Sequence, residues 1–255
     1  MYVLPFGQMS LWGYQCSLKC YLKNYIWNNK IISKGNIFFI SVLFPIANSK
    51  YRGSQRIGPH DMDVLSVIFG SLLGDSYAEK RIRGVGTRIN FYQEDSHYQY
   101  ILWLHNYFKM RGYCSDNIPI LKTRLSQKGK IRKVGRFSTW TYTSFNWIHD
   151  LWYDKGVKKV PMNIGFYLTP LALAIWIMDD GSKVGKNIKL CTNCFTYNEC
   201  LVLVNVLNEN FSLKASIQSA GYKDQYQIYI LKESMTLLKE LIGDLIIPEM
   251  RYKIP

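Results

Sequence analysis

Two apolar segments, each followed by an acidic residue, constrain the fold of this chain more than any other feature. The first runs over 64–73 and is followed by Asp75, and the second runs over 170–178 and is followed by Asp179 and Asp180. Both have the spacing of buried helices. An acid at a helix C-terminus is disfavoured by the helix dipole, so its occurrence after two matched segments favours a functional role. Ordinary core helices with acidic ends remain the alternative.

The same order of elements follows both apolar segments, which identifies an internal repeat. Each copy continues with a strand, a helix, a polar hairpin and a last helix. In the first copy these are predicted at 89–93, 98–104, 124–143 and 145–153, and in the second at 189–193, 199–204, 214–230 and 234–242. The sequence therefore predicts an α+β fold of two αββαββα units, over residues 61–163 and 164–255.

The apolar helices carry small residues at a spacing that allows close packing. Gly70 and Gly74 are one helical turn apart and lie on one face, and Ala174 and Met178 have the same spacing in the second helix. Packing the two helices together would bring both acids to one end of a shared interface. Two carboxylates at a basic surface suit Mg²⁺, because this ion prefers oxygen ligands and phosphate oxygens can complete its shell.

The charge of the chain points to a polyanionic partner. The formal net charge is +14, and both hairpins are basic and alternating. A two-stranded ribbon fits the major groove of DNA, where Arg and Gln contact base edges while Lys mostly contacts phosphate. A solvated sheet face is the alternative. The candidate DNA-binding residues are Arg81, Arg83, Arg88, Asn90, Tyr92, Arg124, Lys128, Lys130, Arg132 and Arg136 in the first unit, and Lys183, Lys186, Lys189, Lys214, Gln218, Lys223, Gln225 and Gln227 in the second.

Other side chains indicate no further metal site. Cys191 and Cys194 have a C-x-x-C spacing, but neither a second pair nor a nearby histidine pair follows them, so strand-buried free thiols are expected. His105 falls in an apolar helical pattern and is expected to pack or cap.

Residues 1–60 differ from the rest of the chain because they contain no acidic residue. The apolar stretch 37–46 is interrupted and shorter than the ~20 residues of a membrane span, so no membrane partner is expected. The turn-rich basic stretch 49–59 is typical of a linker.

The two acid-ended segments resemble the motifs of the LAGLIDADG homing endonucleases and maturases. Ile68-Phe69-Gly70-Ser71-Leu72-Leu73-Gly74-Asp75-Ser76 is similar to the first motif, and Leu173-Ala174-Ile175-Trp176-Ile177-Met178-Asp179-Asp180-Gly181 to the second. The resemblance covers about 60–255. It implies two halves around a pseudo-twofold axis, with saddle-shaped antiparallel sheets and a central two-helix interface. Ser76 departs from the usual final glycine.

The resemblance also implies the roles of individual residues and a Mg²⁺ cofactor. The metal-binding acids of the family match Asp75 and Asp180, with Gly74 and Asp179 beside them at the metal site. Central lysines of the family match Lys158 and Lys253. Polar strand residues that order water match Gln93 and Asn193.

The resemblance implies a monomeric endonuclease that cuts a long double-stranded DNA target. The alternative is a maturase that binds and stabilises group I intron RNA, and the two intact acids favour cleavage. Residues 2–13 resemble a segment of cytochrome b, which implies a reading frame in a fungal mitochondrial intron, with 1–60 as upstream exon and linker. A membrane-associated cytochrome fragment is a weak third alternative, because only these residues favour it.

Overall fold

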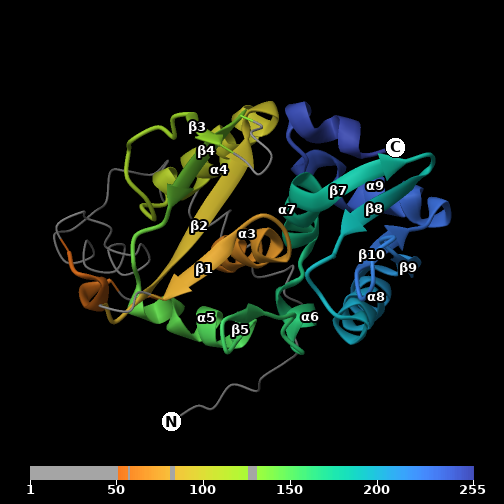
Figure 1. Ribbon diagram of the computed structural model, residues 1–255, viewed down its shortest axis with the longest axis horizontal. Coiled ribbons are helices and arrows are strands. Elements are labelled where there is room, and N and C mark those ends of the chain that lie inside the picture. Colours follow the sequence, from red (N-terminus) through yellow and green to blue (C-terminus); the bar gives the residue numbers. More distant parts are fainter. Residues whose placement is uncertain (1–50, 57, 81–83, 126–130) are drawn as a thin grey trace, which may run out of the picture. The chain divides into compact units, whose positions relative to one another are not determined.

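The computed structural model describes residues 51–56, 58–80, 84–125 and 131–255. Within this part of the chain, two four-stranded antiparallel sheets have the same strand pattern. Their orders are β1-β2-β4-β3 and β7-β8-β10-β9, so each consists of two hairpins joined through their second strands. Figure 1 shows the two central helices, α3 and α7, lying side by side between the sheets. The predicted α+β fold of two repeated units is confirmed.

The first half follows the predicted order of elements. Its central helix is α3 (Met62–Leu73), and its outer helices are α4 (Tyr98–Met110) and α5 (Asn146–Trp152). The strands are β1 (Tyr77–Lys80), β2 (Thr87–Glu94), β3 (Lys122–Leu125) and β4 (Ile131–Ser138), followed by the short pair β5 (Tyr153–Asp154) and β6 (Val157–Lys158). Residues 126–130, within the hairpin predicted over 124–143, lie outside the described residues.

The second half repeats this order after the short helix α6 (Ile164–Tyr167). The helices are α7 (Pro170–Asp180), α8 (Tyr197–Phe211) and α9 (Met235–Ile242). The strands are β7 (Gly181–Val184), β8 (Asn187–Cys191), β9 (Ala215–Ser219) and β10 (Tyr226–Ile230), and the chain ends in the 3-10 segment η7 (Pro248–Lys253).

Local sequence explains where the helices begin. The Asp61 side chain accepts a hydrogen bond from the backbone of Asp63 at the start of α3. Thr169 does the same for Ala172 at the start of α7, where Pro170 takes the first helical position. Thr196 and Glu199 form a capping box before α8. Each of these three helices therefore starts at a residue whose side chain accepts a hydrogen bond from a free backbone N–H group.

Alternation along the strands divides each sheet into a buried and an open face. On β10, Ile228 and Ile230 are buried and face α8, while Gln227 and Tyr229 lie on the other face. In the first sheet, Phe91 stacks on Phe137 with ring centroids 4.8 Å apart. The apolar faces join the central helices in one core, and the polar faces are left for other contacts.

Close packing of α3 against α7 depends on Gly70. A Cβ atom at this position would lie 2.4 Å from the backbone oxygen of Ala172 and 2.9 Å from Cβ of Ile175. The predicted close approach is therefore present. The nearest atoms of α7 belong to Ala172 and Ile175, and not to Ala174 or Met178 as the spacing predicted, because α7 presents a different face to α3.

The structure refines two predicted boundaries. Helix α3 ends at Leu73, so Asp75 lies just beyond the helix, whereas α7 extends through Asp180. Arg56, in the stretch predicted as a linker, is buried, and its guanidinium lies 5.1 Å from the Trp140 ring centroid.

No helix of the described residues has the length and apolar character needed to cross a bilayer.

Candidate active centre between the central helices

The C-terminal ends of α3 and α7 meet through an unequal pair of residues. Gly74 follows α3, and a Cβ atom there would lie 2.4 Å from Cβ of Asp179 and 2.8 Å from its Oδ2. Asp179 therefore occupies the space that Gly74 leaves open. It is 6 % exposed, and its Oδ2 has no hydrogen-bond partner.

One amide connects the acids of the two halves. Nε2 of Gln93, on β2, donates to Oδ2 of Asp75 at 2.8 Å and to Oδ1 of Asp179 at 3.1 Å. Asp180 is half-buried at the end of α7, and the charge of Asp75 acts on it. The structure thus brings together Asp75, Asp179 and Asp180 at one end of the helix interface.

The two candidate lysines occupy matching places at the ends of the central helices. Nζ of Lys158 donates to the backbone oxygens of Gly74 at 3.3 Å and Ser76 at 2.9 Å. Nζ of Lys253 donates to the backbone oxygen of Asp179 at 2.8 Å and also to that of Met178. A cation at a helix C-terminus interacts favourably with the dipole, so each lysine offsets the unfavourable position of the acids.

Burial of so many charges in one place changes their pKa values. Burial raises the pKa of Asp180 to about 7, and repulsion from Asp75 contributes to the shift. Burial likewise raises the pKa of Asp179 well above its usual range, and it raises that of Asp75 against the hydrogen bond from Gln93. Burial lowers the pKa of Lys158 and Lys253. The acids repel one another unless protons or a cation balance them.

This donor set fits a hard divalent cation that is shared with another ligand. In the described residues, no group of three or more His, Cys, Asp or Glu side chains is placed to hold a metal ion by itself. The carboxylates of Asp75 and Asp180 nevertheless supply oxygen ligands, and Oδ2 of Asp179 is buried and unpartnered beside them. Mg²⁺ binds through one or two carboxylates and substrate phosphates, which this arrangement allows.

Three residues of this centre escaped sequence analysis. Nδ1 of His97 lies 3.2 Å from Oε1 of Gln93, and its Nε2 lies 2.8 Å from the hydroxyl of Tyr252. The buried Tyr100 hydroxyl interacts with Asp179. Gln93 lies on a strand and His97 in the turn that follows it, so the four-residue spacing carried no helical signal of this contact.

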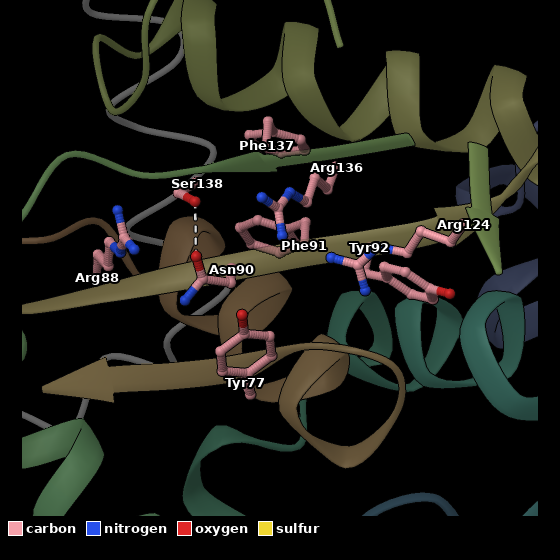
Figure 2. Close-up of a pocket in the computed structure, with 9 residues that line it drawn as sticks. All are labelled: Tyr77, Arg88, Asn90, Phe91, Tyr92, Arg124, Arg136, Phe137 and Ser138. Carbon is pink, nitrogen blue, oxygen red and sulfur yellow. Dashed lines mark hydrogen bonds between the residues drawn. The ribbon is translucent and has the colours of Figure 1, made fainter. Parts of the chain in front are cut away.

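The open face of the first sheet carries most of its predicted DNA-binding residues. It contains a pocket of about 200 Å³ that Tyr77, Arg88, Tyr92, Arg124 and Arg136 help to line (Figure 2). Arg88 pairs with Glu79 at 2.8 Å. Asn90 and Arg132 lie on the same face, and Arg81, Arg83, Lys128 and Lys130 lie outside the described residues.

The predicted residues of the second half lie on its sheet or at its turns. Lys189 and Gln227 lie on the open face, and Gln218 pairs with Gln227 across β9 and β10. Lys183 pairs with Ile188 and so points to the other face at the sheet edge. Lys186 and Lys223 lie in exposed turns, Gln225 immediately precedes β10, and Lys214 pairs with Glu233 at 2.8 Å.

Asn193 is not placed like Gln93. It lies beyond the end of β8, is exposed, and donates from Nδ2 to Oε1 of Gln225 at 3.2 Å. Cys191 and Cys194 are free thiols as predicted, but Cys194 is exposed rather than strand-buried, because β8 ends at Cys191. His105 is buried and its Nε2 lies 2.9 Å from the backbone oxygen of Ser115, in agreement with a packing role.

Known proteins are similar to this chain in sequence and in fold. The chain is 50% identical over 196 residues to the cytochrome b mRNA maturase bI2 of Debaryomyces hansenii, covering 77% of this chain and 75% of that protein. It is 47% identical over 208 residues to the maturase of the same name from Saccharomyces cerevisiae, covering 79% of this chain and 49% of that protein.

A solved structure extends the likeness to the fold. The homing endonuclease I-WcaI, bound to its DNA recognition sequence, superposes with a TM-score of 0.71 at 24% identity, covering 88% of this chain and 95% of that one. Residues 65–238 match the LAGLIDADG DNA endonuclease family, a span that begins within α3 and includes α7 and both sheets. The resemblance of the two motifs is thereby confirmed, and this chain belongs to the LAGLIDADG DNA endonuclease family.

Proposed function

We propose that this protein is a site-specific endonuclease that hydrolyses both strands of a DNA target with Mg²⁺. The observation that carries the proposal is the meeting of Asp75, Asp179 and Asp180 at one end of the helix interface, between two sheets with polar open faces. A phosphodiester backbone along the sheets would supply the oxygen ligands and the negative charge that this centre lacks.

The residues of the centre have distinct roles in this proposal. Asp75 and Asp180 hold the cation, with Asp179 and the backbone at Gly74 shaping the site. When bound, Mg²⁺ would stabilise charge on the phosphate and lower the pKa of a water molecule. Lys158 and Lys253 add positive charge and fix the helix ends. Gln93 orients Asp75 and would order water near the phosphates.

Binding of DNA rests on the open faces of the sheets. Arginines and glutamines on the strands would contact base edges, and the lysines would contact phosphates. The net charge of +14 favours association with DNA and makes it dependent on salt. We expect a monomer, because both halves of the site belong to one chain.

A second function is favoured by the relatives. Both yeast proteins are described as cytochrome b mRNA maturases. Binding and stabilising group I intron RNA would use the basic surface but would not need the acids.

We propose that the reading frame lies in a mitochondrial cytochrome b intron and that residues 1–60 derive from the upstream exon. We also propose that the two halves of the fold divide between residues 163 and 164.

Cleavage of a plasmid that carries the joined exon sequence tests the endonuclease proposal. With Mg²⁺, the protein should yield linear DNA, and the variants Asp75→Asn and Asp180→Asn should not. Asp224→Asn is the matched control, since this exposed turn residue has φ 56° and asparagine accepts that conformation. Intact plasmid together with faster splicing of the intron RNA would reject cleavage in favour of the maturase function.

A further inference from the structure

Arginine is distributed unequally between the two sheets. The strands of the first sheet contain Arg88, Arg124, Arg132 and Arg136, whereas the strands of the second sheet, all of them described, contain none. The second sheet instead pairs Gln218 with Gln227. Because the strand order is the same in both sheets, corresponding strands present different chemical groups on their open faces.

Two of the four guanidinium groups are neutralised within the protein. Arg88 forms an ion pair with Glu79, and Arg132 forms one with Glu94, each at 2.8 Å. These contacts hold the groups on the sheet and reduce their charge toward a ligand.

Arg124 and Arg136 remain available for a ligand. No acidic side chain of the described residues lies within ion-pair distance of either. Arg136 is paired with Tyr92 across β4 and β2, and the guanidinium of Arg124 lies 6.0 Å from the Tyr92 ring centroid. Figure 2 shows both arginines beside Tyr92 on the open face of the sheet.

The open face of the second sheet presents a cluster of carboxamides. Gln218 is exposed and lies directly across from Gln227. Nε2 of Gln227 donates to Oδ1 of Asn193 at 3.4 Å, and Nδ2 of Asn193 donates to Oε1 of Gln225 at 3.2 Å. The side chains on this face can therefore both donate and accept hydrogen bonds, unlike the guanidinium groups of the first sheet, which only donate.

The difference between guanidinium and carboxamide groups determines which bases each sheet can recognise. A guanidinium group donates two hydrogen bonds to O6 and N7 of guanine, whereas the carboxamide of glutamine matches N6 and N7 of adenine. We propose that the target has unlike half-sites, with guanines read by Arg124 and Arg136 of the first sheet and adenines read by Gln218 and Gln227 of the second. The inference rests on the proposed binding of DNA and adds the base preference of each half.

Selection of bound duplexes from a random DNA pool tests this inference with the full chain. The wild type should enrich a long site with guanines in one half and A·T pairs in the other. Arg136→Gln should reduce the guanine preference at one position of the guanine half by about tenfold or more and leave the other half unchanged. Gln218→Leu should reduce the adenine preference at one position of the opposite half.

Arg111→Gln is the control for Arg136→Gln. Arg111 lies at the end of α4 and not on a strand, and its guanidinium donates to the backbone oxygen of Tyr107, so its variant should keep the wild-type base preference. A site enriched by the wild type that neither Arg136→Gln nor Gln218→Leu alters would overturn the inference and leave DNA binding intact. A pool without any enriched sequence would reject both the inference and the proposed DNA binding. Thermal unfolding of each variant confirms that it folds.

Discussion

The two halves of this chain share a strand order but differ at the centre where they meet. In the first half the central helix is followed by Gly74, and in the second half Asp179 fills the corresponding space. The Gln93 side chain, which contacts Asp75 and Asp179, belongs to the first half alone. Repetition of the fold therefore does not require repetition of the site, and the two acids at the helix ends have different surroundings.

Both halves have a lysine that contacts the C-terminal end of the central helix. Lys158 and Lys253 each donate to backbone oxygens at the end of the central helix in their own half. These contacts satisfy carbonyl groups that a helix end leaves free. Variants that treat the halves separately can measure how much of the centre is symmetric.

The largest expected effect comes from removing either acid. Asp75→Asn and Asp180→Asn should each slow cleavage by about a thousandfold or more, because a metal ligand is lost from a site that needs both. Single-turnover rates on a duplex with each strand labelled separately measure this. A variant that stops cutting one strand while the other is cut at the normal rate would show that the halves act independently.

The next effect is on stability and concerns the helix interface. Gly70→Ala should lower the free energy of unfolding by about 3 kcal/mol, because its Cβ would overlap the backbone oxygen of Ala172. Urea denaturation measures the change. Gly243→Ala is the control, since nothing lies within 4 Å of a Cβ at that position. Equal stability of the two variants would contradict the close packing of α3 and α7.

A smaller effect on stability should distinguish the two lysines. Lys253 is 5 % exposed, whereas Lys158 is half-buried. Lys253→Met should therefore cost about 1–3 kcal/mol of stability through unsatisfied buried carbonyls, and Lys158→Met should cost less. Urea denaturation compares both with Lys239→Met, an exposed residue of α9. The reverse order would mean that the second helix end does not depend on its lysine.

The smallest effect is a change of stability with pH in metal-free buffer. Burial raises the pKa of Asp180 to about 7 from an ordinary value of 3.8, so the folded state binds more protons than the unfolded state between these values. The contribution of Asp180 is present at low pH and is lost as pH rises through about 7.

Thermal unfolding in the presence of a chelator should follow this loss. The melting temperature of the wild type should fall more than that of Asp180→Asn between pH 5.5 and pH 8.5, and Mg²⁺ should reverse the fall at the higher pH. Identical pH dependence of the two proteins would show that Asp180 is not held in a repulsive environment.

The fold could be predicted because helices and hairpins depend on residues that are close together in the sequence. Apolar periodicity and turn residues determine where helices and hairpins lie, and repetition makes each half a check on the other. The packing face of α7 was predicted less well, since the spacing of Ala174 and Met178 does not reveal which face meets Gly70.

The spacing between the repeats did not predict which strand residues lie at the candidate site. Gln93 and Asn193 have matching places in the two sequence repeats, but they lie on different faces of their sheets. Gln93 shares the buried face of β2 with Phe91. Asn193 follows the buried Leu190 by three residues, so it falls on the open side of the second sheet, where it contacts Gln225. The contact of His97 with Tyr252 joins residues far apart in the chain, which no local pattern could indicate.

The contact between Gly74 and Asp179 has a consequence for the symmetry of this protein. Asp179 fits beside the central helix of the first half because position 74 has no side chain. An aspartate on both sides of the interface would overlap at this point, so the second half could not pair with a copy of itself in the same way. The two halves are therefore complementary and not interchangeable at this contact.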